Sequence, residues 1–234
     1  MINYAHRGAS EYAPENTLSS FYLGLLQGAN GIETDVQRTK DGCLVLFHDD
    51  TVDRVSDYSG KVADYTLAEL KDMKIYGNCT TGFYDKIVTL REFLEKFSQY
   101  DIKFAIELKG AGVEEETLLM IKEFGIMDKT TFTSFKFEYI EKIKSLCPSA
   151  RVGWLTTRTD DEAIKMLKSI GGEEYAPEAE KITNDLMKKW RENGFGVRAW
   201  GVYNTSLMKK MCELQVDGMT VNFPDRLFQY LKAL

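Results

Sequence analysis

Short apolar segments alternate along this chain with longer segments of helical periodicity, and this alternation constrains the fold more than any other feature. It is typical of a parallel sheet whose strands are connected by helices. The predicted strands are Ile2–Ala5, Gly31–Gln37, Leu44–Phe47, Phe104–Leu108, Thr130–Phe132, Val152–Leu155, Glu174–Ala176, Gly196–Trp200 and Met219–Val221. Helical patterns fill the intervals: a first helix with the apolar face Leu18, Phe21, Tyr22, Leu25 and Leu26, then Leu90–Tyr100, Glu114–Phe124, Phe137–Leu146, Asp160–Ser169, Thr183–Asn193 and Ser206–Leu214.

The second and third predicted strands lie too close in sequence to be parallel neighbours. Parallel strands need a connection of about a dozen residues, whereas residues 38–43 leave room only for a turn. Asp41-Gly42 within this segment is a strong hairpin signal. The third strand therefore folds back on the second, and the eight strands that remain predict a (β/α)8 TIM barrel of the α/β class. Such barrels run to roughly 200–250 residues as one domain, which fits the 234 residues of this chain.

The hairpin also predicts which polar residues meet. A two-residue turn at Asp41-Gly42 places Asp35 opposite His48 and Glu33 opposite Asp50, while a longer turn shifts this pairing by a residue or two. Side chains alternate along a strand, so Glu33 and Asp35 share one face with Gln37. Local geometry alone thus brings two acids and a histidine together.

Acidic side chains within strand patterns need an explanation, because strand interiors are normally apolar. Glu33 and Asp35 lie in one predicted strand, and Glu107 lies near the end of another, two residues before Lys109. The carboxyl ends of barrel strands converge on one face, where three carboxylates repel one another unless a cation holds them. Oxygen ligands favour Mg²⁺ or Ca²⁺. The alternative is that Glu107 pairs with Lys109 while the other two acids face water.

The chain contains two histidines, His6 and His48, and each falls at the end of a strand-like segment. A lone histidine is more often structural than catalytic. Because both histidines of the chain fall at the predicted barrel mouth, a role in proton transfer is favoured, since histidine exchanges protons near neutral pH. Arg7 and Gly8 follow His6, and an arginine fork beside a flexible glycine suits a phosphate group.

These motifs together resemble the glycerophosphodiester phosphodiesterase family. They are His6-Arg7-Gly8-Ala9, Pro14-Glu15-Asn16-Thr17, Gly31-Ile32-Glu33-Thr34-Asp35, Thr39-Lys40-Asp41-Gly42, His48-Asp49, Ile106-Glu107-Leu108-Lys109, Ser134-Phe135 and Trp200-Gly201-Val202. The resemblance covers nearly the whole chain in order. It implies a single barrel domain, residues 1–234, with a divalent-metal site. It also implies a small insertion, about residues 53–86, that stands over the barrel mouth.

The resemblance assigns roles where the motifs match. It implies His6 and His48 as the general acid/base pair, Glu33, Asp35 and Glu107 as metal ligands, Arg7 and Lys109 as phosphate contacts, Glu15 and Asn16 as substrate-side or supporting residues, and Phe135 and Trp200 as an apolar wall. Two segments depart from the family pattern. The usual Trp-Thr-Val-Asn reads Trp200-Gly201-Val202-Tyr203-Asn204, and the usual Thr-Asp-Arg-Pro reads Val221-Asn222-Phe223-Pro224-Asp225-Arg226.

The expected function is metal-dependent hydrolysis of a small-molecule glycerophosphodiester, such as glycerophosphocholine or glycerophosphoethanolamine, to glycerol 3-phosphate and an alcohol. Two alternatives keep the same site: hydrolysis of a lysophospholipid or another phosphodiester, and non-catalytic binding of a phosphorylated ligand. The insertion is either a lid that selects the substrate or merely a folded loop.

Composition limits partners and location. The formal net charge is −6, so the chain lacks the overall positive field that nucleic acids require. It has neither a signal-peptide pattern at the start nor an apolar run long enough to predict stable membrane insertion. Cys43, Cys79, Cys147 and Cys212 lack metal or redox spacing, which predicts free thiols and a cytoplasmic location. The sequence leaves the oligomeric state open.

Overall fold

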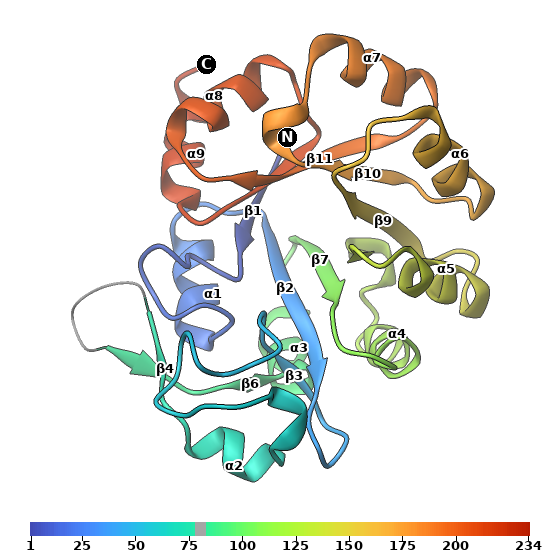
Figure 1. Ribbon diagram of the computed structural model, residues 1–234. Helices are drawn as coiled ribbons and strands as arrows, with labels where there is room; N and C mark the ends of the chain where they lie inside the picture. The colour runs from blue at the N-terminus through green and yellow to red at the C-terminus, as the bar shows by residue number, and fades with distance from the viewer. Residues whose placement is uncertain (78–82) are drawn as a thin grey trace.

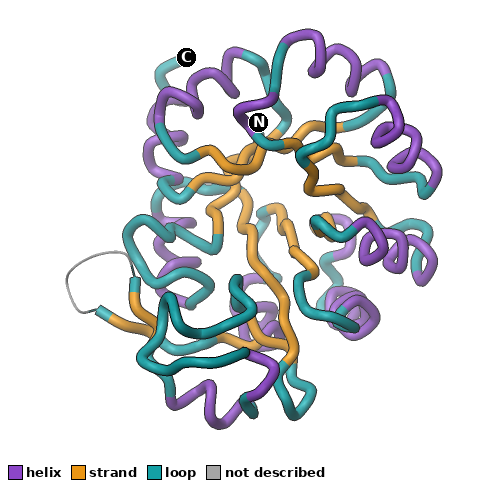
Figure 2. The backbone as a smooth tube through the Cα atoms, in the orientation of Figure 1, coloured by secondary structure: helices purple, strands orange, loops and turns teal. Residues whose placement is uncertain are grey.

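Eight parallel strands close into a barrel that the helices surround (Figures 1 and 2). The structure, a computed structural model, describes residues 1–77 and 83–234, and these statements concern those residues. The barrel strands are β1 (Ile2–His6), β2 (Gly31–Arg38), β7 (Lys103–Leu108), β8 (Thr130–Ser134), β9 (Arg151–Thr156), β10 (Glu174–Pro177), β11 (Gly196–Val202) and β12 (Gly218–Val221). The ring closes because β1 pairs in parallel with both β12 and β2. The predicted barrel is confirmed.

The connecting helices lie on the outside of the barrel (Figure 2). They are α1 (Leu18–Leu26), α3 (Leu90–Phe97), α4 (Glu114–Glu123), α5 (Phe137–Leu146), α6 (Asp161–Ser169), α7 (Asn184–Glu192), α8 (Thr205–Glu213) and α9 (Pro224–Lys232). Thr17 caps α1, because its side chain accepts a hydrogen bond from the backbone N–H of Ser20. Every helix predicted from periodicity is present with small differences at its ends, and α9 was not among those predicted.

Strand β2 is long enough to pair with two different strands along one edge. Its first half pairs with β1, from Gly31 opposite Tyr4, and its last residues pair with antiparallel β3 (Leu44–Leu46). The extra hairpin strand is therefore confirmed. The pairing predicted for a two-residue turn is wrong, and the strand adopts the shift expected of a longer turn, here by one residue. Asp35 lies opposite Phe47, whose backbone N–H donates to the Asp35 carbonyl (3.0 Å), so Asp35 does not face His48 and Glu33 does not face Asp50.

The one-residue shift has a local cause. Residues 40–42 form a three-residue turn, closed where the Thr39 backbone N–H donates to the Cys43 carbonyl (2.9 Å). Gly42 ends this turn with a φ of +90°, a conformation that glycine adopts without steric cost. Asp-Gly is equally suited to a three-residue loop of this type, so the sequence motif marked the hairpin but not its length.

The insertion, of which residues 53–77 and 83–86 are described, packs on the face of β3 that points away from the barrel core. It contains α2 (Leu67–Asp72) and the paired short strands β4 (Ile75–Tyr76) and β5 (Tyr84–Asp85), and β6 (Val88–Thr89) follows it and pairs with β3. A separate apolar cluster holds it there: Val45, Phe47, Val52, Val55, Val62, Leu70, Met73, Ile75 and Ile87. The insertion is thus a folded unit with its own small core, beside β3 and β6 in Figure 1.

Below the mouth, the barrel interior contains a buried ion pair. Arg198 of β11 is 2% exposed, and its Nε donates to Glu174 Oε1 of β10 (2.8 Å). The guanidinium also lies 5.4 Å from the centre of the Tyr4 ring. Gly153 of β9 makes room, because a Cβ there would lie 2.7 Å from Glu174 Oε1. Two charged residues therefore occupy positions that are apolar in most barrels.

Three of the four cysteines lie within the described residues. Cys43, Cys147 and Cys212 are free thiols, as expected, and Cys79 lies outside the described residues. Across residues 1–77 and 83–234, no helix combines the length and the apolar character that crossing a bilayer takes.

Candidate active site

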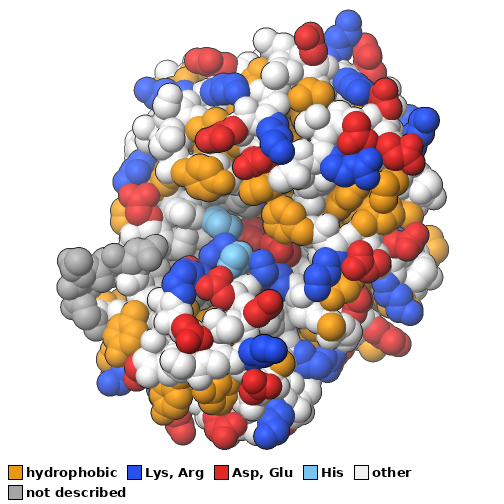
Figure 3. Space-filling view, in the orientation of Figure 1, with side chains coloured by type: hydrophobic (Ala, Val, Ile, Leu, Met, Phe, Trp, Pro, Cys, Tyr) orange, Lys and Arg blue, Asp and Glu red, His pale blue; other side chains and the backbone are white. Residues whose placement is uncertain are grey.

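The carboxyl ends of the barrel strands surround a hollow with a volume of about 190 Å³. Figure 3 shows both histidines in a depression near the middle of this face, with acidic side chains behind them and basic ones beside them. The hollow is lined by His6, Arg7, Glu33, His48, Glu107, Phe135, Leu155, Arg198, Trp200, Gly201, Tyr203 and Thr220. Residues predicted from widely separated motifs therefore meet at one place.

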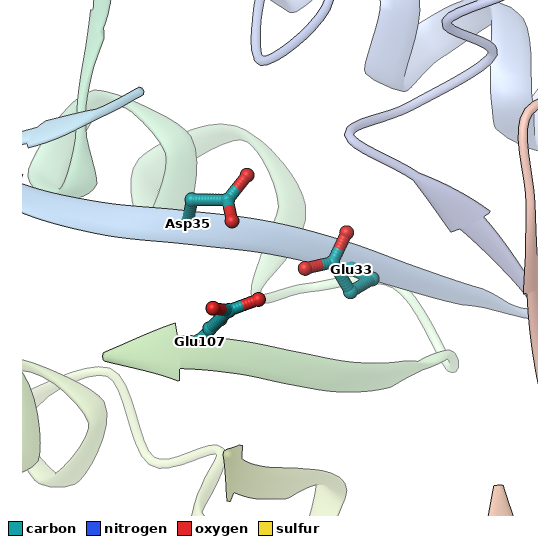
Figure 4. Close-up of side chains that lie close together, drawn as sticks. All are labelled: Glu33, Asp35 and Glu107. Carbon is teal, nitrogen blue, oxygen red and sulfur yellow. The ribbon is translucent and has the colours of Figure 1, made fainter. Parts of the chain in front are cut away.

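Three carboxylates lie close together in the floor of this hollow (Figure 4). Asp35 of β2 is directly opposite Glu107 of β7, and Glu33 of β2 is opposite His6 of β1. One oxygen from each of Glu33, Asp35 and Glu107 lies within 4.8 Å of the others. All three side chains are buried, Asp35 completely. The predicted cluster is thus present in the structure.

Basic and amide groups surround Asp35 in particular. Its Oδ2 accepts a hydrogen bond from Asn16 Nδ2 (2.9 Å) and lies 3.4 Å from Arg7 Nε. Lys109 Nζ lies 3.7 Å from Asp35 Oδ1 and 3.3 Å from Glu107 Oε1. The alternative arrangement from the sequence is therefore only half right. Glu107 does pair with Lys109, but Glu33 and Asp35 do not face water.

The protonation of the cluster follows from this environment. Burial, followed by repulsion from Asp35, raises the pKa of Glu107 to about 7 and raises the pKa of Glu33 as well. Burial also opposes ionisation of Asp35, but Arg7 and Lys109 outweigh it and lower the pKa of that carboxyl. Of the three carboxylates, Asp35 alone is strongly stabilised as an anion by the surrounding protein groups.

A hard divalent cation fits these three residues. All the donors are carboxylate oxygens, which Mg²⁺ and Ca²⁺ prefer. Asp35 Oδ1 is buried and has no hydrogen-bond partner within the described structure, and an orphaned buried oxygen is costly unless something satisfies it. A cation here would also remove the repulsion that favours protonation of Glu33 and Glu107. The residues could therefore hold a metal ion.

Each histidine has its Nδ1 atom fixed by a protein oxygen. His6 ends β1, and its Nδ1 lies 2.6 Å from Asn222 Oδ1, while its Nε2 lies 3.9 Å from Glu33 Oε2. His48 Nδ1 lies 2.5 Å from Asp49 Oδ1. Because both partner oxygens accept, Nδ1 carries the proton and Nε2 is the free nitrogen of the neutral ring.

Gln37 holds the loop that carries His48. Its Nε2 donates to the carbonyls of Phe47 (3.1 Å), His48 (3.3 Å) and Asp49 (2.6 Å). His48 therefore reaches the mouth through this loop and not through the predicted cross-strand pairing with Asp35. Period-two alternation placed Gln37 on the same face as Glu33 and Asp35, but no sequence pattern indicated that it would hold this loop.

The remaining predicted residues also lie around the mouth. Arg7 Nη1 donates to Glu15 Oε1 (2.9 Å), and Asn16 joins Asp35 to Thr34, whose hydroxyl donates to Asn16 Oδ1 (2.7 Å). Arg7 and Asn16 each have a φ of +56°, an uncommon conformation that tends to mark functional sites. Phe135 and Trp200 form an edge-to-face pair with ring centres 5.0 Å apart.

Several contacts at the mouth were not predicted. Asn222, which follows β12, orients His6, yet the sequence marked it only as a departure from a family pattern. Arg54, from the insertion, bonds both Glu15 and Asp49. Arg198 forms part of the floor. Arg198 could have been noticed because a charged residue is unusual within a predicted strand. No sequence pattern links Arg54 to Glu15.

Known proteins share this architecture. A model of the glycerophosphoryl diester phosphodiesterase family matches residues 6–226. A glycerophosphodiester phosphodiesterase from Caldanaerobacter subterraneus is 32% identical over 236 residues, covering 97% of this chain and 96% of the relative. One from Bacillus altitudinis is 33% identical over 236 residues, covering 95% of each. A solved phosphodiesterase from Oleispira antarctica, in complex with the product sn-glycerol-3-phosphate, has a TM-score of 0.86 and 28% identity, covering 98% of this chain and 96% of that one.

Proposed function

Because the chain belongs to the glycerophosphoryl diester phosphodiesterase family, we propose that it uses a divalent cation and two histidines to hydrolyse small glycerophosphodiesters, such as glycerophosphocholine or glycerophosphoethanolamine. The products are glycerol 3-phosphate and the free alcohol. The observation that carries the proposal is the mouth itself, where the buried carboxylate cluster adjoins His6, His48 and Arg7 in one hollow. The product bound to the Oleispira antarctica relative supports a substrate of this size.

In this proposal Glu33, Asp35 and Glu107 hold Mg²⁺ or Ca²⁺. When bound, the ion supplies positive charge for the phosphoryl oxygens, whose negative charge grows as the diester reacts. Arg7 and Lys109 add donors on the same side, and each is already positioned by its contact with Asp35. Glu15 and Asn16 orient Arg7 and Asp35, and Phe135 with Trp200 forms an apolar wall beside the glycerol or alcohol part.

The Nε2 atoms of the two histidines divide the proton transfers, one ring starting neutral and the other protonated. One histidine removes a proton from the attacking oxygen, either of water or of the glycerol 2-hydroxyl, as that oxygen bonds to phosphorus. The other histidine enters the reaction as the imidazolium, with Nε2 protonated, and gives that proton to the alcohol oxygen as its bond to phosphorus breaks. With the glycerol hydroxyl as nucleophile, a cyclic phosphate forms first, and water then opens it by the same pair of transfers in reverse roles.

Metal depletion tests this function directly. Excess chelator should abolish the release of choline from glycerophosphocholine, and Mg²⁺ or Ca²⁺ should restore it, because the ion supplies positive charge that the reacting phosphoryl oxygens need. The isosteric variant Glu107→Gln should require a higher metal concentration for half-maximal activity than the wild type.

Three outcomes would contradict parts of the proposal. Full activity at negligible measured metal content would exclude a role for the cation. Turnover of lysophosphatidylcholine in preference to glycerophosphocholine would favour the lipid substrate. Absence of turnover with either compound, alongside measurable binding of glycerol 3-phosphate, would favour a non-catalytic binder.

We further propose that the insertion, residues 53–86, selects among substrates. Replacing it with a short loop should change the ratio of kcat/KM for two head groups by about tenfold or more, since loops at the barrel mouth determine specificity. A second variant that replaces only residues 56–86 retains Arg54 and separates the loss of that residue from the loss of the segment. Unchanged head-group preference in a folded variant would make the insertion a passive loop, whereas failure of both variants to fold would make it part of the core with Val45 and Phe47.

A further inference from the structure

Arg54 of the insertion contacts two acidic residues at the barrel mouth. Its Nη1 and Nη2 donate to the two carboxylate oxygens of Glu15 (2.8 and 2.7 Å), and its Nε donates to Asp49 Oδ2 (2.6 Å). Glu15 belongs to the loop after β1, and Asp49 belongs to the loop after β3. One planar guanidinium, whose donor geometry matches carboxylates in this way, thus joins the loop after β1 to the segment after β3.

Both acids lead directly to residues of the proposed mechanism. Glu15 Oε1 also accepts from Arg7 Nη1 (2.9 Å), and Arg7 Nε lies 3.4 Å from Asp35 Oδ2. On the other side, the second oxygen of Asp49 holds His48 Nδ1 (2.5 Å). Arg54 therefore lies one carboxylate away from the phosphate contact and one carboxylate away from a proton-transfer group.

The backbone that carries Arg54 is fixed by packing. Val52 and Val55, on either side, are buried in the apolar cluster of the insertion. The Val52 backbone N–H donates to the Gly60 carbonyl (2.9 Å), and Tyr76 N–H donates to the Val55 carbonyl (2.7 Å). The insertion thus presents the Arg54 side chain from a rigid support, as precise orientation of a site requires.

We propose that Arg54 is a positioning residue, which fixes Arg7 through Glu15 and His48 through Asp49. This inference rests on the proposed function. Without Arg54, Glu15 would be left with Arg7 alone and Asp49 with His48 alone, so that both side chains gain freedom to rotate. The insertion would then contribute to the rate as well as to substrate choice, because it supplies the side chain that orients both Arg7 and His48.

Kinetics of Arg54→Met test the effect on the reaction. Supporting residues of this kind typically contribute about 10–100-fold, so kcat should fall by about that factor while KM changes less. Arg54→Lys should recover only part of the loss, because an ammonium cannot bond both Glu15 oxygens and Asp49 at once. The matched control is Arg91→Met, which removes a bidentate contact to Glu123 (2.8 and 2.9 Å) from a side chain of the same exposure, 45% against 44%, away from the mouth. The control should retain full activity.

Double mutants distinguish positioning from a general structural role. In a His48→Ala or Glu15→Gln background, the Arg54→Met substitution should cause a smaller further loss of kcat than it causes alone, because the groups act as a unit. Losses that multiply fully in both backgrounds, or near-wild-type kcat for Arg54→Met, would overturn the proposal.

A measurement independent of turnover separates this inference from the proposed function. The chain contains two histidines, so imidazole NMR signals are few, and a His6→Ala sample assigns them. Arg54→Met should shift or broaden the Nδ1–H signal of His48, and Arg91→Met should leave it in place. An unchanged His48 signal in Arg54→Met would refute the positioning role even if the wild type hydrolyses none of the substrates tested.

Discussion

Replacing either His6 or His48 with alanine is expected to lower kcat by about 10²–10⁴-fold, the range that positioned proton transfer usually contributes. Both imidazoles line the same hollow, and each has Nδ1 held by a protein oxygen and Nε2 left free. The double mutant should lose less than the product of the two single losses, because an acid and a base that act in one step lose most of their joint effect with the first removal.

Metal content must be measured in each variant, because His6 Nε2 lies only 3.9 Å from Glu33 Oε2. Near-wild-type kcat in one variant would remove that histidine from the mechanism. A variant that loses its bound metal, but keeps its kcat once metal is fully restored, would show that the histidine is a metal ligand or a group that orients one.

The pH profile gives a second view of the same pair. Burial and the nearby Arg7 lower the pKa of His6, and burial, despite the opposing charge of Asp35, lowers the pKa of His48. A histidine with a lowered pKa becomes protonated, and so stops acting as a base, only at a pH below the ordinary pKa of histidine. At saturating metal, where Glu33 and Glu107 stay ionised, the acidic limb of kcat/KM for the wild type should therefore lie below about pH 6.5. A limb well above that value would contradict a histidine as the base.

Most of the fold was predictable because its elements follow from local patterns. Strands such as Val152–Leu155 are apolar runs bounded by polar residues, and helices such as Phe137–Leu146 carry an apolar stripe. The hairpin register was not predictable, since Asp41-Gly42 fits loops of two or three residues. The structure shows a three-residue loop, in which Gly42 is the last residue of the turn and has a positive φ.

The predicted site residues share one property, which is that each adjoins the end of a strand or a strong motif. Glu33, Asp35 and Glu107 were recognisable because acids are unusual in strands that are buried on both faces. The contacts of Arg54 and Asn222 could not be predicted in this way. They join segments 39 and 216 residues apart, and neither residue interrupts a periodic pattern. Tertiary packing creates such pairs, and a single sequence carries no local trace of them.

Arg198 and Glu174 give the second large expected effect, on stability. Arg198→Met should lower the free energy of unfolding by about 3–5 kcal/mol, because it leaves Glu174 as an uncompensated charge inside the barrel. Arg198 is 2% exposed and Glu174 is 6% exposed, so little of the Glu174 carboxylate is open to water that could replace the lost partner. The matched control is Arg158→Met, which breaks an exposed pair with Asp160 (2.7 Å) and should cost about 0–1 kcal/mol. Urea unfolding monitored by tryptophan fluorescence measures both.

The double substitution Arg198→Met with Glu174→Leu decides between charge and packing as the cause. Replacing a buried ion pair by apolar residues of similar volume is often neutral or stabilising, so the double variant should recover most of the stability that Arg198→Met loses. No recovery would mean that the fit of these side chains against Tyr4 and Gly153 matters more than their charges.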